Sequence, residues 1–493
     1  MAKEEYSMPD PRVTSHGGDG PSVSYERLYT LDSKQGDYLR LFPDLRPLAI
    51  PRSVLGRLGA PDGPMVDQDE QPGWSGQPQP SDNTAIPAGY TYLGQFIDHD
   101  LTLDFTSDPN RLNPIEELPN ARTPAFDLDS VYGLGPEASP HLYERGDKLA
   151  TADRGGVRDL QRREDAGQRF GVALIGDPRN DENQLVSQVH LALMNLHNKL
   201  MERVEDFEEA RKLTRWHYQW VVLHDFLRKT VGSNLVNDVL SAGPVFFTKK
   251  KRHALPVEFT VASYRFGHSQ VRPDYVLKEG GTPIAVFAPD DDQEGRDLRG
   301  GTKLTEDHKV DWNQFFDFGG GNPQPTRLID AKLSPALFRM FPGPPGQGSD
   351  VPPEERLLAF RNLRRGVAMG LPSGESVAKY MIESLNEHGR PTFNMKVLND
   401  QELGGSEYRS ARGPGETPLW YWILAEARTL AEGKTLGPVG GRIIAEVFVG
   451  LLENDERSFL SEDPGWEPIE EFKRNGVFDM AALLVASGDA SPA

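Results

Sequence analysis

The sequence predicts a mainly α-helical fold built as one large helical domain. Apolar residues recur at helical spacing over most of the chain, strand-like alternation is rare, and no clear linker separates two cores. Residues 183–205 show this best, because apolar side chains form one helical stripe from Val186 to Leu200. The length of 493 residues alone suggests about three domains, but the unbroken helical pattern favours one.

The expected elements follow in chain order. Residues 1–85 are rich in Pro, Gly, Asp and Ser and predict an extended arm that packs on the core, while residues 86–493 form the helical domain. Gly- and Pro-rich breakers predict loops over residues 279–328. Helices are expected at residues 91–105, 183–205, 206–241, 256–272, after Ser334, and at 353–368, 373–386, 417–431 and 437–453.

Composition excludes several classes of function. A net charge of −20 argues against a nucleic-acid partner, which requires clustered Lys and Arg. The absence of cysteine excludes disulfides, Cys–Zn sites, iron–sulfur clusters and thiolate ligation of a metal. The N-terminus lacks the apolar stretch of a signal peptide, and no apolar run approaches the ~20 residues of a spanning helix. We expect a soluble, cytoplasmic protein without a membrane partner, with signal-independent export as the alternative.

The most informative segment is the predicted helix over residues 91–105. Gln95, Asp98 and His99 share one face of it, among apolar neighbours. Burial of three polar groups in such a surround is costly unless each has a partner. The cluster is therefore either a satisfied polar core or an active site.

A second polar cluster, GDPRNDEN, stands just before the predicted helix 183–205. Acidic residues in the first turn of a helix stabilise its dipole, which accounts for Asp181 and Glu182. It does not account for Arg179, three residues before Glu182. Helix capping and a functional role of Arg179 and Glu182 are both open at this point.

His268 lies in the segment ASYRFGHSQVRP, within the predicted helix 256–272. A single histidine beside an apolar face is more often a satisfied core residue than a metal ligand. Asn362, in RNLRRGVAMGLP, is a candidate hydrogen-bond partner for a buried imidazole, and metal-bound histidines use such partners. Both interpretations of His268 are kept.

The run RTPAFDLDSVYG alternates with a period of two. In an extended loop its hydroxyl, backbone carbonyl and carboxylate oxygens point to one side, and these are oxygen ligands suited to calcium. The alternative is a solvated, Asp-rich turn. The candidate ligands are Thr123, Ala125, Asp127 and Asp129, with Asp100 completing the set.

Taken in order, these segments resemble the haem peroxidases of the peroxidase–cyclooxygenase superfamily. Each motif is weak alone, but seven in this order at compatible separations are specific. The resemblance covers residues 85–455 and implies a mainly α, animal-type haem peroxidase domain in a bacterial member. The motifs are GQFIDHDLT, FDLDSVYG, GDPRNDE, HLALMNLHNKL, YRFGHS, RNLRR followed by GLP, and LGPVGGRI.

The resemblance implies roles on both sides of a haem. His99 matches the distal histidine, Arg179 its arginine partner, and Gln95 the glutamine that helps to hold distal water or halide. His268 matches the proximal iron ligand and Asn362 its hydrogen-bond partner.

Further roles concern the attachment of haem and calcium. Asp98 and Glu182 match the carboxylates that form ester links to a b-type haem in this family, while Arg265 and Arg365 are candidates for pairing with its propionates. The implied calcium ligands are Asp100, Thr123, Ala125, Asp127 and Asp129.

Three positions depart from the family pattern. Asn183 follows Glu182 where myeloperoxidase-type members carry the Met of a sulfonium link, so that third link is expected to be absent. Arg265 stands where cyclooxygenases and plant fatty-acid dioxygenases carry a radical tyrosine, which argues against an oxygenase of that type. The stretch GVAM after Arg365 replaces the charged run usual in the family.

The function implied is that of an oxidoreductase acting on peroxide, in the response to oxidative stress. Its partners are hydrogen peroxide and a small reductant: a halide or pseudohalide (iodide, thiocyanate, bromide) or a small aromatic donor. The first alternative is a haem-dependent oxygenase acting on a dedicated metabolite or fatty acid. The second is a haem-binding protein without activity, against which the joint presence of Gln95, His99, Arg179 and His268 argues.

Overall fold

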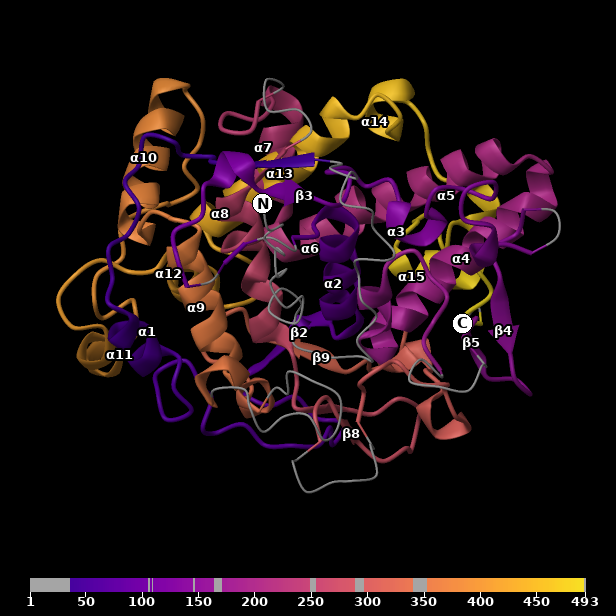
Figure 1. Cartoon of the computed structure of the whole chain (residues 1–493), viewed down its shortest axis with the longest axis horizontal. Helices are drawn as coiled ribbons and strands as arrows, with labels where there is room; N and C mark the ends of the chain where they lie inside the picture. The colour runs from indigo at the N-terminus through magenta and orange to yellow at the C-terminus, as the bar shows by residue number, and fades with distance from the viewer. Residues whose placement is uncertain are drawn as a thin grey trace, which may run out of the picture.

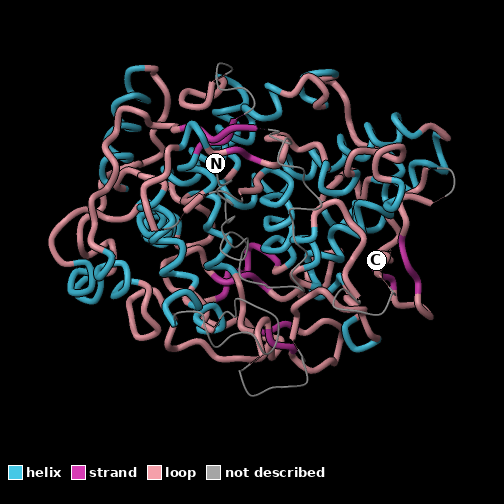
Figure 2. Tube along the Cα trace, viewed as in Figure 1, coloured by secondary structure: helices cyan, strands magenta, loops and turns pink. Residues whose placement is uncertain are grey.

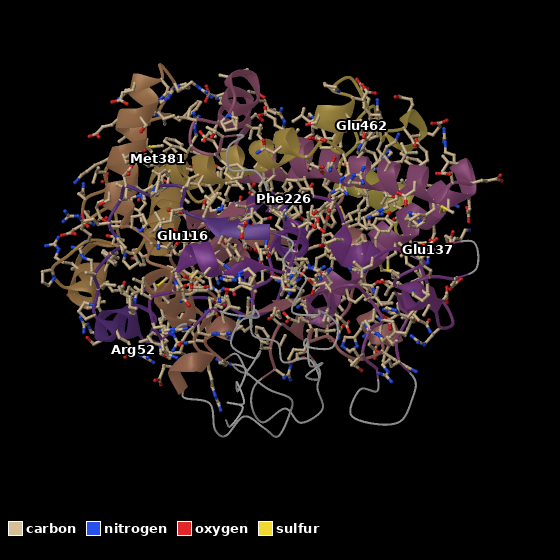
Figure 3. The ribbon with its side chains drawn as sticks, turned by 45° about the horizontal axis from the view of Figure 1, so that its top comes forward. Arg52, Glu116, Glu137, Phe226, Met381 and Glu462 are labelled. Carbon is tan, nitrogen blue, oxygen red and sulfur yellow. The ribbon has the colours of Figure 1, made fainter. Side chains whose placement is uncertain are left out.

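The computed structural model describes residues 36–491 apart from 105–106, 109, 145–146, 164–170, 249–253, 289–296 and 340–352. Helices dominate this part of the chain and the strands are short (Figure 2). The prediction of a mainly α-helical single domain is confirmed, because the helices share one connected hydrophobic core. Figure 3 shows Phe226 in the interior, whereas the charged residues Arg52, Glu137 and Glu462 lie at the periphery.

The α-helices are α1 Arg52–Leu58, α2 Gly89–Leu101, α3 Asp129–Tyr132, α4 Gln184–Val204, α5 Phe207–Val221, α6 Leu227–Val231, α7 Ser233–Ala242, α8 Val257–Thr260, α9 Leu358–Ala368, α10 Gly374–Glu387, α11 Gly405–Arg412, α12 Leu419–Ala431, α13 Pro438–Asn454, α14 Phe459–Glu462 and α15 Met480–Ala486. The 3₁₀ helices that bear on the site are η5 Pro178–Asp181 and η8 Ser263–Gln270. In Figure 1, α2 lies in the middle of the molecule, with α4 and α5 on one side and α9, α10 and α12 on the other.

The strands form four small sheets. β1 pairs with β3 in antiparallel and with β6 in parallel orientation, and the other three sheets are antiparallel pairs, β2–β9, β4–β5 and β7–β8. Their bounds are β1 Gly36–Leu39, β2 Asp82–Pro87, β3 Pro119–Asn120, β4 Thr151–Asp153, β5 Arg158–Leu160, β6 Ala254–Pro256, β7 Asp274–Tyr275, β8 Ile284–Ala285 and β9 Pro325–Arg327.

α4 is the helix that the sequence predicts best. The side chain of Asn183 caps it by accepting a hydrogen bond from the backbone N–H of Leu185 at 2.8 Å. The apolar stripe from Val186 to Leu200 is buried against α2 and α5. The expected span 183–205 is thus confirmed as a continuous helix of 21 residues.

The single helix expected over residues 256–272 is wrong. The structure has the short α8 and then η8, because the backbone of Ala262 leaves the helical conformation. The hydroxyl of Ser263 donates to the carbonyl of Gly440 at 2.7 Å, an interaction that ties η8 to α13 rather than to its own turn. The long helix expected over residues 206–241 is likewise divided, with a π-helical turn at Val222–Phe226 between α5 and α6.

The N-terminal segment contributes to the core as far as it is described. Phe42, Leu55 and Met65 are buried, and the backbone N–H groups of Leu41 and Phe42 donate to the carboxylate of Glu258 in α8. Residues 1–35 of the predicted arm lie outside the described residues. The domain boundary at residue 85 stays a prediction. Within the described part, no helix combines the length and apolar character needed to cross a bilayer.

Candidate active site

A cavity lies between α2 and η8. Gln95 and Asp98 line it from α2, Glu182 lines it just after η5, and His268 lines it from η8. Most of the remaining wall is aromatic or aliphatic. The space measures about 890 Å³ including its opening to solvent. Four of the predicted site residues, distant in sequence, therefore share one cavity.

His268 is held by α9. The amide of Asn362 lies 2.9 Å from Nδ1 of His268. Burial lowers the pKa of His268 well below its usual range, and the cations of Arg265 and Arg361 lower it further. The imidazole is thus neutral, the form that binds a metal. The atom of Asn362 in this contact is the amide nitrogen Nδ2. A 180° rotation of the amide about its terminal bond brings the oxygen to the same place, and Nδ1 of His268 then donates its proton and leaves the lone pair of Nε2 for a ligand.

His99 is completely buried on the other side, in α2. Its Nδ1 lies 2.9 Å from the amide oxygen Oδ1 of Asn180. Burial, together with the guanidinium of Arg179, lowers the pKa of His99 to about 3, so the imidazole is neutral. Neither His99 nor Arg179 is among the described residues that line the cavity; both lie buried beside its α2 wall.

Arg179 is fixed beside His99 by a buried carboxylate. Its Nη2 donates to the backbone carbonyl of His99 at 2.8 Å and to Asp177 at 2.7 Å. Arg122 also pairs with Asp177, at 2.7 Å. Burial alone would raise the pKa of Asp177, but the two guanidinium groups outweigh it and hold the pKa below its usual value. His99 and Arg179 are thus brought together, as predicted.

The capping explanation for the acidic residues before α4 is wrong. Asn183 caps α4 and Asp177 caps η5. Asp181 instead pairs with Arg162, at 2.6 Å. The side chain of Glu182 is 9% exposed and faces the cavity, as does Asp98, which is 5% exposed. Two buried carboxylates therefore line the same space.

The two arginines assigned to haem propionates, Arg265 and Arg365, bind protein groups outside the cavity lining. Nε of Arg265 donates to the carbonyl of Thr260 at 2.9 Å, and Nη2 of Arg365 donates to the carboxylate of Asp104 at 2.6 Å. Neither is among the described residues that line the cavity. Their pairing with propionates stays a prediction.

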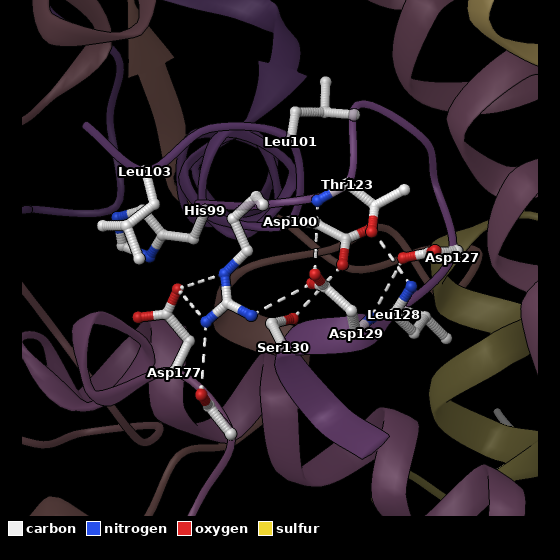
Figure 4. Close-up of polar contacts among 12 residues, drawn as sticks. His99, Asp100, Leu101, Leu103, Thr123, Asp127, Leu128, Asp129, Ser130 and Asp177 are labelled. Carbon is white, nitrogen blue, oxygen red and sulfur yellow. Dashed lines mark hydrogen bonds and ion pairs between the residues drawn. The ribbon is translucent and has the colours of Figure 1, made fainter. Parts of the chain in front are cut away.

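The predicted calcium carboxylates converge. One oxygen each of Asp100, Asp127 and Asp129 lies within 4.8 Å of the others, and Figure 4 shows the three side chains around one point. Leu128, with φ of 60°, turns the chain so that α3 begins at Asp129. Thr123 belongs to the same group, because its N–H lies 3.4 Å from a carboxylate oxygen of Asp129.

Without a cation, repulsion among the three buried carboxylates would destabilise the folded state. Burial and the other two carboxylates raise the pKa of Asp100 well above its usual value, and burial and Asp129 raise that of Asp127 to about 7. Arg457 and Arg122 offset only part of the charge, by pairs of 3.2 Å with Asp127 and Asp129. A solvated turn is therefore the wrong explanation: Asp127, within that turn, is only 6% exposed.

Sequence reasoning missed three residues that contact His99 or Arg179, directly or through one neighbour: Asp177, Asn180 and His190. The first two stand in the GDPRNDEN segment beside Arg179 and carried no separate signal. His190 is one of the buried residues of α4, and nothing in the helical pattern of the sequence distinguishes it from the other core positions.

Parts of the chain are similar in sequence to known proteins. Residues 95–288 match the family model for animal haem peroxidases. A chorion peroxidase of Drosophila melanogaster is 24% identical over 370 residues, covering 69% of this chain and 42% of that protein. Heme peroxidase 2 of Caenorhabditis elegans is 27% identical over 359 residues, covering 67% of this chain and 47% of that protein. The chain thus spans less than half the length of these relatives.

Solved structures support the fold. Peroxidase A of Dictyostelium discoideum superposes with a TM-score of 0.58 at 17% identity, covering 90% of this chain and 93% of that one. The fatty acid alpha-dioxygenase of Oryza sativa gives a TM-score of 0.52 at 16% identity, covering 83% of this chain and 74% of that one. At these identities the similarity concerns the fold.

Proposed function

We propose that the chain is a haem peroxidase, an oxidoreductase that reduces hydrogen peroxide to water and oxidises a small donor. The match of residues 95–288 to the animal haem peroxidase family model supports this proposal. The observation that carries the proposal is the shared cavity of Gln95, Asp98, Glu182 and His268, with His99 and Arg179 buried beside it. A satisfied structural core would not direct four polar residues from three separate parts of the chain into one apolar space.

The residues around the cavity fit a haem. The neutral His268, with Nδ1 bound to Asn362, would hold the iron through Nε2. Asp98 and Glu182 face the space from the opposite wall and would form the two ester links. When bound, haem supplies an iron centre that takes oxidising equivalents from peroxide and passes them to the donor.

Residues in α2 and next to it would transfer the proton of peroxide and stabilise its negative charge. A neutral His99 takes a proton at Nε2 from one peroxide oxygen and returns it to the other, as general base and then general acid. Arg179, fixed by Asp177, supplies a permanent positive charge next to the negative charge that develops as the O–O bond breaks. Gln95, at the cavity wall, orients water or a small anion.

A calcium ion completes the proposal. It would bind Asp100, Asp127 and Asp129 together with oxygens of Thr123 and Ala125. Because Asp100 directly follows His99, the ion would fix the C-terminal turn of α2 and with it the imidazole. Its role is geometric and not redox.

The proposed donors are iodide, thiocyanate and bromide, or small phenols. Ester links accompany a high reduction potential in this family, which favours halide oxidation, whereas Asn183 gives no third link and disfavours chloride. The test is oxidation of each donor by the haem-loaded protein with added peroxide, compared with His268→Ala. We expect peroxide-dependent oxidation that the variant loses; equal rates in both proteins would contradict the proposal.

An oxygenase acting on a fatty acid is the rival function. The fatty acid alpha-dioxygenase of rice shares the fold. Oxygenases of that type carry a radical tyrosine three residues before the proximal histidine, whereas this chain has Arg265 there, and its Nε donates a hydrogen bond to the backbone carbonyl of Thr260. Oxygen uptake by the haem-loaded protein with palmitate separates the two. We expect none above the haem-free control; uptake together with absent donor oxidation would favour the oxygenase.

A further inference from the structure

A buried hydrogen-bond chain links His99 to a second histidine. The amide oxygen Oδ1 of Asn180 lies 2.9 Å from Nδ1 of His99, and the amide nitrogen Nδ2 lies 3.0 Å from Nδ1 of His190. His99, Asn180 and His190 are all completely buried. The three residues come from α2, η5 and α4, so the chain crosses the elements that form the α2 side of the site.

The two ends of the amide fix the direction of each bond. A carbonyl oxygen only accepts, so Nδ1 of His99 must carry the proton, and its Nε2 keeps the basic lone pair. The NH₂ group only donates, so Nδ1 of His190 must be unprotonated, and the proton of His190 sits on Nε2. The two imidazoles are therefore held in opposite tautomers.

Neighbouring groups also hold the backbone of Asn180 and the ring of His190. The backbone N–H of Asn180 donates to the carbonyl of Asp177 at 3.0 Å within η5. The ring of His190 packs edge-on to Phe96 of α2, with centroids 5.9 Å apart. Among the described residues, no group hydrogen-bonds to Nε2 of His190, so the bond to Asn180 is the polar contact that sets its tautomer.

We propose that Asn180 and His190 are positioning residues that keep the proton of His99 on Nδ1 and its basic lone pair on Nε2. The proposal rests on the proposed function, in which Nε2 of His99 takes the proton of peroxide. An imidazole that carries its proton on Nε2 has no lone pair there and cannot act as the base. Asn180 would thus supply the correct tautomer before the substrate arrives.

The direct test is the tautomer of each histidine, measured by ¹H–¹⁵N correlation spectra of the full chain with ¹⁵N-labelled histidine rings near neutral pH. The chain has 11 histidines, so the signals of His99 and His190 are assigned by their loss in His99→Gln and His190→Gln. We expect the Nδ1–H tautomer for His99 and the Nε2–H tautomer for His190. An Nε2–H tautomer of His99 in the wild type would overturn the proposal.

Two variants of Asn180 separate tautomer control from packing. In Asn180→Asp the carboxylate only accepts, so His99 should keep Nδ1–H while His190 changes to Nδ1–H. In Asn180→Leu the polar link is lost at similar volume, so the Nε2–H tautomer of His99 should gain population. Unchanged spectra of both histidines in the folded Asp variant would overturn the proposal, even where the Leu variant fails to fold.

Kinetics complete the test. In haem-loaded protein, Asn180→Leu should slow the reaction with peroxide by about 10²-fold or more, since a wrongly protonated catalytic histidine loses its function. Asn180→Asp should restore a large part of that rate, and donor binding should be unaffected in both. An equal loss in both variants would contradict tautomer control. A wild type that ignores peroxide would overturn the proposed function, while the spectra would still decide the tautomers.

Discussion

At the residue scale, the proposed reaction with peroxide depends most on the neutral imidazole of His99. His99→Ala removes the proton acceptor and donor, and general acid–base groups contribute roughly 10²–10⁴-fold to rates. We expect the second-order rate of the haem-loaded protein with peroxide to fall by that factor in stopped-flow absorption.

The matched control is His388→Ala, at an exposed position that does not line the cavity. Its rate should equal that of the wild type. A loss of less than about tenfold in His99→Ala would remove His99 from the catalytic role.

The carboxylates of Asp98 and Glu182 make a separate prediction about haem attachment. Since both are buried at the cavity wall, Asp98→Asn and Glu182→Gln should each increase the fraction of haem that acid–acetone extracts after turnover with peroxide. The exposed Glu116→Gln serves as control. Extraction identical in all four proteins would show that the ester assignment is wrong.

At the scale of elements, the loop before α3 and the end of α2 are joined by their acidic group. Removal of the proposed calcium ion would leave three carboxylates within 4.8 Å of one another. A ligand that binds only the folded state and is present at about 100 times its Kd raises the free energy of unfolding by about 2.7 kcal/mol. Chelation should therefore lower the unfolding midpoint by several degrees, and added calcium should restore it.

Asp127→Asn should reduce that calcium-dependent shift, because it removes one of the charged ligands. Asp307→Asn, at an exposed site with 90% side-chain exposure, should keep it. A midpoint that does not respond to chelator or calcium in the wild type would eliminate the calcium site.

The contact between α12 and α13 predicts a pH dependence of stability. The carboxylate of Glu426 accepts hydrogen bonds from the N–H groups of Val439 and Gly440 at the start of α13, yet burial raises its pKa to about 8. The unfolded chain releases this proton near pH 4.3. Between about pH 4.3 and 8 the folded state thus binds more protons, and stability falls as pH rises.

Glu426→Gln removes the titration and keeps the side-chain volume. The unfolding midpoint of the wild type should fall relative to this variant as pH rises from 5 to 8, with a limit of about 1.4 kcal/mol per pH unit. The exposed Glu416→Gln should follow the wild type. Parallel curves for wild type and Glu426→Gln would contradict the raised pKa.

Individual elements differ in how well the sequence predicts them. α4 has a side-chain cap and an uninterrupted stripe, so local signals determine its bounds. η8 was expected as part of a longer helix, because the break at Ala262 depends on the contact of Ser263 with α13, a residue pair 177 positions apart. Tertiary contacts of this range leave no local pattern.

At the scale of the whole molecule, the site combines α2, η5, η8 and α9. The ordered motifs predicted that Gln95, Asp98, Glu182 and His268 meet, and they do. They did not predict Asn180 on Nδ1 of His99, nor Asp104 as the partner of Arg365. Motifs name the residues that carry the chemistry, whereas the partners that fix them are set by packing between elements.

We propose that this cavity holds haem through His268, and a haem titration of the purified full chain is the decisive experiment. We follow the Soret band during the titration and after one equivalent of peroxide, in the wild type and in His268→Ala. The account predicts saturation at one haem per chain and a Soret change with peroxide that a donor reverses, with both lost in a folded His268→Ala. A wild type without a Soret band, or a variant identical to it, would contradict the account.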